Sequence, residues 1–218
     1  LDNLFKRTCM RWYDNRQQPA RPRNLVDLYV KGTHIRWNEV WSGAARSGID
    51  LSGPALHFPG LAQTLPNPRH WLKQIDYVYS LPVWLAVTHG DLNEHNILVT
   101  KDGRCWLIDF YRTDLGHILR DFVELETAIK FNLTPPLDIA QRAEFERLLL
   151  AQPELGAPAP YAEAAPYAKA AAVIFHLRSL AADALGFSAD STEYYAALLL
   201  QTLNLLRLGF LHRSHEQH

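Results

Sequence analysis

Three polar side chains in the middle of the chain have the types and the spacing that phosphoryl transfer requires. Asp91 and Asn96 share the segment HGDLNEHN, and Asp109 follows in the segment LIDF. Phosphoryl transfer needs one carboxylate to orient and deprotonate the attacking hydroxyl, and further oxygen ligands for the magnesium that neutralises phosphate charge. Asp91 suits the first role, and Asn96 and Asp109 suit the second.

The residues between Asn96 and Asp109 predict a β-hairpin that brings these two side chains together. Residues 97–100 are a short apolar run, residues 101–104 form a Lys-Asp-Gly-Arg turn, and residues 105–108 form the returning strand. The glycine of the turn suits a position with positive φ. We therefore expect Asp109 to lie beside Asn96.

This arrangement resembles a known family. The H-G-D-x-x-x-x-N element, an apolar strand, a D-G turn and I-D-F are similar to the catalytic lobe of the aminoglycoside phosphotransferase and choline kinase branch of the protein-kinase-like fold. The resemblance implies that Asp91 is the catalytic base and that Asn96 and Asp109 bind Mg²⁺ with ATP or GTP. It also implies that His89 braces the catalytic loop and that Asp121, which follows Gly116 and opens a helix, does the same.

Other polar residues near the motif each allow more than one role. His95 could face the substrate, although a surface position is the default for a histidine, and Arg112 could reach substrate or phosphate, although a solvated pair with Asp114 is equally plausible. A zinc site of His89, Asp91 and His95 lacks a fourth ligand. A metallophosphoesterase would need D-x-H and G-H-x-H motifs, which the sequence lacks. The alternative is a purely structural role, in which Asp91 and Asn96 only cap a turn while Asp109 ends a strand.

Composition limits the class of protein. The 218 residues are 48% hydrophobic, and 22 basic residues balance 23 acidic ones to a net charge of −1. The chain can therefore bury a core, and neither nucleic acid nor a membrane is an expected partner. Cys9 and Cys105 form no C-x-x-C motif, and no apolar run approaches the roughly 20 residues of a membrane span, so we expect a cytoplasmic protein. Because the sequence begins with Leu1, we expect it to be part of a longer chain.

Periodicity predicts that most of the chain is helical. A strand is expected at Leu28–Val30, and the Gly- and Pro-rich residues 42–68 are expected to be a loop-rich insertion with at most a short hairpin. Helices are expected at residues 1–17, 67–79, 119–131, 141–152, 161–185 and 192–211, the last two packing together in the core.

The sequence lacks the nucleotide lid that such an enzyme uses. No G-x-G-x-x-G motif precedes the catalytic segment, and Lys31 with Glu39 is a poor match to the strand Lys and helix Glu of a kinase. The predicted fold is α+β, mostly α-helical: residues 1–218 form the C-terminal lobe of a protein-kinase-like fold, residues 87–122 carry the site, and the N-terminal lobe is absent.

Two functions fit this fold. One is phosphoryl transfer from ATP or GTP to a small-molecule hydroxyl, with the N-terminal lobe or other domains of a longer enzyme as partners. Residues 1–218 alone should then bind nucleotide weakly or not at all and show no measurable phosphotransfer, and apolar surface near the hairpin should be exposed. The other follows from a weaker resemblance, carried by residues 108–126, to ternary-complex-associated domains of bacterial signalling and conflict-system proteins. It implies a catalytically inert interaction module.

Overall fold

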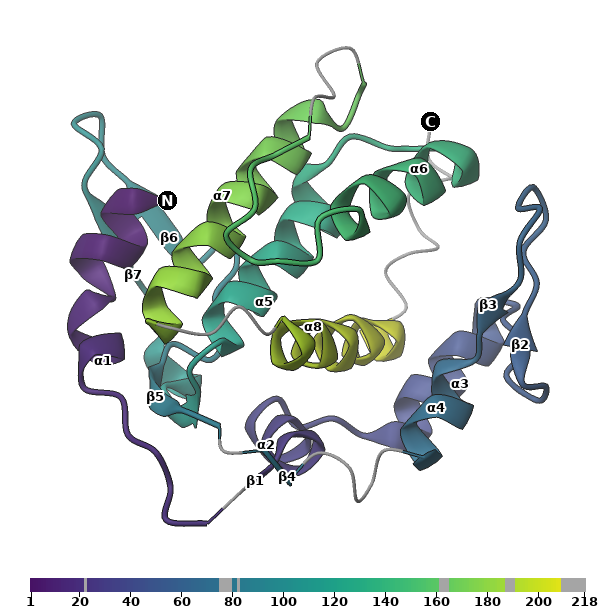
Figure 1. The fold of residues 1–218 in the computed structure, drawn as a ribbon, viewed down its shortest axis with the longest axis horizontal. Coiled ribbons are helices and arrows are strands. Elements are labelled where there is room, and N and C mark those ends of the chain that lie inside the picture. Colours follow the sequence, from purple (N-terminus) through teal and green to yellow (C-terminus); the bar gives the residue numbers. More distant parts are fainter. Residues whose placement is uncertain (22, 75–79, 82, 161–164, 187–190, 209–218) are drawn as a thin grey trace.

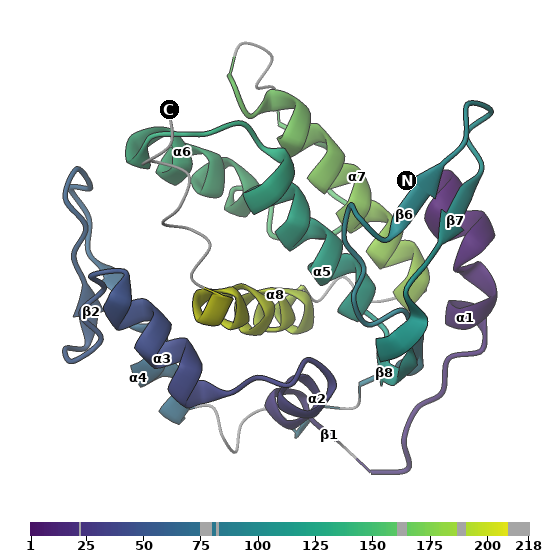
Figure 2. The same ribbon diagram turned by 180° about the vertical axis from the view of Figure 1, so that it is seen from behind.

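The computed structural model of the protein shows a helical body with four small antiparallel sheets around it (Figures 1 and 2). It describes residues 1–21, 23–74, 80–81, 83–160, 165–186 and 191–208. The α-helices are α1 (Met10–Asp14), α2 (Leu25–Gly32), α3 (Trp37–Arg46), α4 (Pro68–Gln74), α5 (Arg120–Ala128), α6 (Ile139–Leu150), α7 (Ala168–Leu185) and α8 (Thr192–Leu205). Shorter helical turns are Asn3–Thr8, Phe110–Arg112, Ile129–Leu133 and Leu206–Leu208.

Each sheet of the described chain has two strands. The pairs are β1 (Arg23–Asn24) with β4 (Ser80–Leu81), β2 (Ala55–Leu56) with β3 (Leu65–Pro66), β5 (Leu85–Thr88) with β8 (Asp114–His117), and β6 (Ile97–Val99) with β7 (Cys105–Leu107). The β6–β7 pair is the expected hairpin, with Ile97 opposite Leu107, and Gly103 in its turn has φ +79°. The prediction of this hairpin is therefore confirmed.

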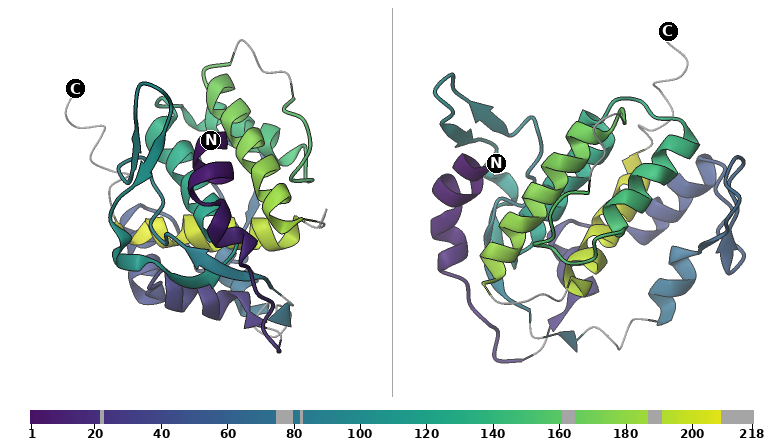
Figure 3. Two further views of the ribbon diagram at one scale, coloured as in Figure 1. Left: turned by 90° about the vertical axis from the view of Figure 1, so that its left-hand side faces the viewer. Right: turned by 45° about the horizontal axis from the view of Figure 1, so that its top comes forward.

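Helix α5 is the centre of the body. Every residue from Arg120 to Ala128 is buried, and α5 packs against both α7 and α8 (Figure 3). Helices α7 and α8 contact each other where the Arg178 guanidinium lies 5.2 Å from the ring centre of Tyr195, but each packs mainly against α5, so the predicted packing of the two helices on each other is confirmed only in part. The N-terminal segment covers another side of α5, since the Phe5 ring stacks on Phe122 at 4.3 Å.

Three expectations about the N-terminal half need correction. Leu28–Val30 is not a strand but part of α2, which begins where the Asn24 side chain accepts a hydrogen bond from Asp27 N and caps the helix. Residues 1–17 do not form one continuous helix, because a π-helical turn at Asn3–Thr8 precedes α1. The predicted insertion at 42–68 begins inside α3, although the short hairpin expected there exists as β2–β3.

The β2–β3 hairpin lies at the end of the molecule opposite the β6–β7 hairpin (Figure 1). The predicted helix at 67–79 is present as α4, and residues 75–79 are outside the described residues, as are 161–164 and 209–211 of the last two predicted helices. None of the described helices combines the length and the apolar character that crossing a membrane requires.

Candidate active site

The segment from His89 to Asn96 is a loop that joins β5 to β6. It leaves β5 through Gly90, whose φ of +79° is a conformation that side chains with a Cβ rarely adopt. A Cβ at this position would lie 2.3 Å from the carbonyl oxygen of Arg112. Glycine therefore allows the loop to pass close to the segment that follows Asp109.

The carboxylate of Asp121 holds the start of this loop. Its Oδ2 accepts hydrogen bonds from His89 N at 2.9 Å and from the Tyr13 hydroxyl at 2.9 Å, and its Oδ1 accepts from Gly90 N at 3.0 Å. Asp121 is fully buried in the first turn of α5, where the helix dipole favours a negative charge. The structure thus places Asp121 against the loop backbone, where the family resemblance implied a brace.

Two further residues of α5 hold the loop, and the sequence argument missed both. Glu124 Oε2 accepts a hydrogen bond from Leu92 N at 2.9 Å, while Arg120 donates from Nε to Glu124 Oε1 at 3.0 Å and from Nη2 to Gly90 O at 2.5 Å. Burial raises the pKa of Glu124 to about 7, and the Arg120 charge opposes this shift. The signal was available: Arg120 and Glu124 have the i, i+4 spacing of an ion pair within a helix rich in apolar residues.

His89 ties the loop to the peptide that precedes Asp109. Its Nε2 lies 2.9 Å from Ile108 O, and its ring packs against Phe110 with centroids 5.3 Å apart. A carbonyl can only accept, so Nε2 is the donor of this hydrogen bond. Nδ1 is buried and has no hydrogen-bond partner among the described residues. His89 therefore contacts the loop's surroundings and not solvent.

Asn96 closes the loop from its other end. Its Nδ2 donates to Asp91 O at 2.8 Å, and its main-chain oxygen accepts from Ile108 N at 3.1 Å. With Nδ2 engaged, Oδ1 is the atom of the carboxamide that could bind a cation. Asn96 is also buried, which fixes its orientation.

Asp109 follows Ile108 in an unusual backbone conformation. Its φ of +64° lies in the left-handed region, and its side chain is exposed. In a regular strand, Asp109 would point to the face opposite Asn96, because Asn96 pairs with Ile108 and side chains alternate. The left-handed residue ends that alternation. A strained backbone of this kind is common at functional sites.

Asp91 and Arg112 lie close together at the edge of the site. Arg112 Nη1 is 3.9 Å from Asp91 Oδ1, and both side chains are about one third exposed. His95 is mostly exposed, and its Nε2 lies 3.4 Å from Glu94 Oε1. The structure therefore places Arg112, but not His95, in contact with the proposed base.

The donor set suits a hard cation held by few protein ligands. No group of three or more His, Cys, Asp or Glu side chains among the described residues could hold a metal. Asn96 and Asp109 offer one amide and one carboxylate oxygen, and Mg²⁺ at phosphate sites is commonly bound by one or two protein side chains while phosphates and water complete its shell. The residues fit Mg²⁺ of this kind.

Comparison with known proteins identifies the family. The profile of ternary complex associated domain 9 matches residues 20–207. The chain belongs to this family. The matched region includes every residue of the candidate active site except Tyr13, which precedes it.

More distant similarity connects this family member to a kinase. The chain is 49% identical over 43 residues to 3-deoxy-D-manno-octulosonic acid kinase of Xylella fastidiosa, in strains M23, Temecula1 and 9a5c. The matched residues are 20% of this chain and 17% of the relative, so the chain spans less than a fifth of the length of these curated proteins. No solved structure matches the chain.

Proposed function

We propose that the protein carries out or supports magnesium-dependent phosphoryl transfer from ATP or GTP to a hydroxyl of a small molecule, on a scaffold like the C-terminal lobe of a kinase. One observation carries the proposal: hydrogen bonds join the loop of Asp91 and Asn96 to Ile108, the residue before Asp109, through His89 Nε2 and Ile108 O and through Ile108 N and Asn96 O, while Asn96 Nδ2 donates to Asp91 O. The similarity of 43 residues to proteins named 3-deoxy-D-manno-octulosonic acid kinase supports the same reaction class.

The residues of this site have distinct proposed roles. Asp91 accepts the proton of the attacking hydroxyl and orients it, for which its partly exposed carboxylate is suited. Asn96 Oδ1 and the Asp109 carboxylate would hold Mg²⁺, which would supply positive charge to balance that of the phosphate. Arg112, close to Asp91, is placed to contact the phosphate or the acceptor.

The exposed face around the β6–β7 hairpin fits a covering lobe. Large apolar side chains are exposed along the hairpin and just after it: Leu98, Val99, Trp106, Ile108, Phe110 and Tyr111, the last at 93%. Clusters of exposed apolar residues mark interaction or ligand sites. We propose that a nucleotide and an N-terminal lobe or another domain of the protein cover this face, beside Asp109.

Asn substitutions in the full-length protein test the roles. Asp91→Asn should lower the transfer rate at least a hundredfold, because a general base contributes about 10²–10⁴, with nucleotide binding and melting temperature unchanged. Asp109→Asn should weaken magnesium-dependent nucleotide binding. Asp14→Asn, an exposed carboxylate on α1, is the matched control. Transfer by Asp91→Asn at the wild-type rate would remove Asp91 from the mechanism.

The alternative is a catalytically inert interaction module in a multidomain bacterial signalling or conflict-system protein. The family match favours it, because the family is described by association in a ternary complex and not by an activity. Under this alternative, full-length protein shows no transfer with any acceptor, and the Asp91 and Asp109 substitutions leave its binding to other proteins unchanged. Loss of nucleotide binding in Asp109→Asn would instead support the enzyme.

A further inference from the structure

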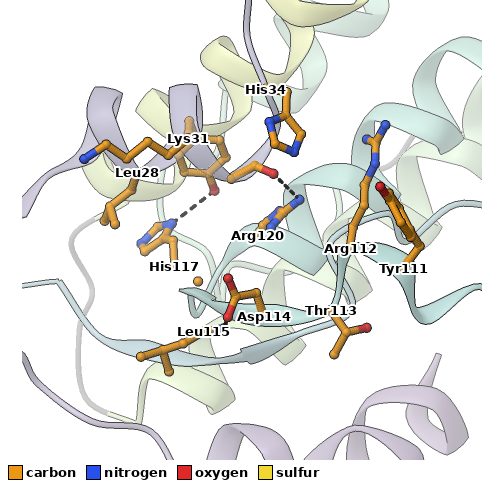
Figure 4. A pocket seen from close by; sticks show the side chains of 13 residues that line it. Leu28, Lys31, His34, Tyr111, Arg112, Thr113, Asp114, Leu115, His117 and Arg120 are labelled. Carbon is orange, nitrogen blue, oxygen red and sulfur yellow. Dashed lines mark hydrogen bonds between the residues drawn. The ribbon is translucent and has the colours of Figure 1, made fainter.

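A cavity of about 520 Å³ lies beside the candidate active site (Figure 4). One wall comes from α2 and the residues after it, and the other from residues 111–117. Arg112 belongs to this second wall and also lies 3.9 Å from the Asp91 carboxylate, so Arg112 connects the cavity to the proposed base. Its volume lies within the roughly 300–1,000 Å³ of small-molecule sites.

The walls of the cavity are fixed by internal bonds. Its buried His117 bridges two residues: the Tyr29 hydroxyl lies 3.1 Å from Nδ1, and Glu193 Oε1 lies 2.5 Å from Nε2. Because a carboxylate accepts, His117 Nε2 donates to Glu193, while Nδ1 shares the other hydrogen bond with the Tyr29 hydroxyl. This chain joins α2, β8 and α8. A cavity with such walls exists before any ligand arrives, which lowers the cost of binding.

Among the charged groups of the lining, Lys31 is the cation that has no carboxylate partner among the described residues. Arg112 also lines the cavity, but the Asp91 carboxylate lies 3.9 Å away and offsets its charge, and the His34 imidazole adds a hydrogen-bonding group. Arg120 does not add to this charge, because Glu124 pairs with it and Gly32 O and Gly90 O accept from its Nη2. The carboxylate of the cavity lining is Asp114, whose Oδ1 already accepts from Leu115 N at 2.7 Å.

His34 has a backbone geometry that few residues tolerate. Its φ is +54°, in the left-handed region, directly after Thr33, the C-cap residue of α2. This conformation ends the helix, since Ile35 N donates to Val30 O at 3.2 Å across the turn. It also places an exposed imidazole in the lining of the cavity (Figure 4).

We propose that this cavity binds a hydroxylated small molecule that carries an anionic group, a carboxylate or a phosphate ester. Lys31 recognises the anion, His34 and Asp114 form hydrogen bonds with hydroxyls, and one hydroxyl faces Asp91. The placement of a hydroxyl at Asp91 rests on the proposed phosphotransfer function, whereas the binding of the anionic molecule in the cavity does not.

Three probes with matched carbon chains test the charge requirement: D-gluconate, D-glucitol 6-phosphate and neutral D-glucitol. Calorimetry on the purified protein without nucleotide should show binding of at least one anionic probe, at least fivefold tighter than glucitol and weaker at high salt, because exposed charges are screened. The better of the two anionic probes identifies the preferred group. Equal binding of glucitol, or no binding of any probe at millimolar concentration, would overturn the proposal.

Substitutions locate the binding. Lys31→Gln should weaken the anionic probe about fivefold to tenfold, as loss of one charge-assisted contact predicts, while Lys31→Arg should retain it. His34→Asn, which tolerates the left-handed backbone, should also weaken it. Lys101→Gln in the turn of the β6–β7 hairpin is the matched control. An unchanged affinity in Lys31→Gln would place the probe elsewhere and refute the site.

The anion-binding cavity and the phosphotransfer function can be refuted independently of each other. Anion binding needs no nucleotide, so a protein that binds gluconate at Lys31 without phosphoryl transfer keeps the cavity site and loses only its link to Asp91. A protein that transfers phosphate to a neutral acceptor, with unchanged kinetics in Lys31→Gln, keeps the reaction and loses the anion site.

Discussion

Replacing Asp121 with asparagine tests whether this carboxylate positions the loop from His89 to Asn96. The substitution keeps the shape of the side chain and removes one acceptor atom. In the native protein, Oδ1 accepts from Gly90 N, and Oδ2 accepts from His89 N and the Tyr13 hydroxyl. An amide has only one oxygen, so in either orientation its NH₂ group faces a main-chain N–H.

The cost follows from that mismatch. A buried donor left without a partner costs about 1–3 kcal/mol, and a hydrogen bond to a charged acceptor contributes about 1.5–3 kcal/mol. The two estimates describe the same event, so the free energy of unfolding should fall by about 2–3 kcal/mol. For a chain of this length, the melting temperature should fall by about 5–10 °C.

Tyr13→Phe is the comparison that isolates the loop. It removes one hydrogen bond from the same carboxylate and leaves both main-chain donors satisfied, so it should cost only about 1 kcal/mol. Denaturant unfolding measures both variants. Hydrogen exchange at the His89 and Gly90 amides should accelerate about thirtyfold or more in Asp121→Asn. Equal stability of the two variants, with unchanged exchange at these amides, would refute the bracing argument.

Three further predictions concern glycine, pH and a buried ion pair. In thermal unfolding, Gly90→Ala should destabilise the protein by at least about 1 kcal/mol more than Gly103→Ala, roughly the cost of added strain. Both glycines have φ +79°, but only at Gly90 would the added Cβ lie 2.3 Å from a carbonyl oxygen. Burial raises the pKa of Glu124 from 4.5 to about 7. Between about pH 4.5 and 7 the folded protein therefore binds a proton that the unfolded chain releases, so the free energy of unfolding should fall as pH rises through this range. If the melting temperature of Glu124→Gln falls with rising pH as steeply as that of the native protein, this reasoning is wrong. Glu126→Gln should cost about 3 kcal/mol in denaturant unfolding, because it leaves the buried Arg178 guanidinium without its two-point partner; a loss under 1 kcal/mol, typical of exposed pairs, would argue against it.

Local sequence signals predicted the local part of the site. The Asp-Gly turn flanked by apolar runs specified the β6–β7 hairpin, and the hairpin alone brings Asn96 beside the peptide before Asp109. The helix at Asp121 followed from similar local evidence. These elements form because neighbouring residues determine them.

Contacts distant in sequence were not predictable in the same way. Tyr13 reaches Asp121 across 108 positions of sequence, and no local pattern marks that contact. Leu28–Val30 was predicted as a strand because its residues favour strands, whereas the cap at Asn24 and the burial of Leu25 and Tyr29 select helix α2. Tertiary packing overrides propensity in such short segments.

The charged residues of the buried helix α5 position other parts of the protein. Replacing buried ion pairs by apolar side chains is often neutral or stabilising, so stability alone does not account for four charged residues along one buried helix. The hydrogen bonds of these residues account for them. Arg120, Asp121 and Glu124 bond to the loop that carries Asp91, and Glu126 bonds to α7 and α8 through Arg178 and Tyr194. Each bond requires a specific geometry, which an apolar contact does not. The helix therefore sets the position of the loop relative to the helical body. A site whose chemistry depends on the placement of Asp91, Asn96 and Asp109 needs this kind of support more than it needs additional stability.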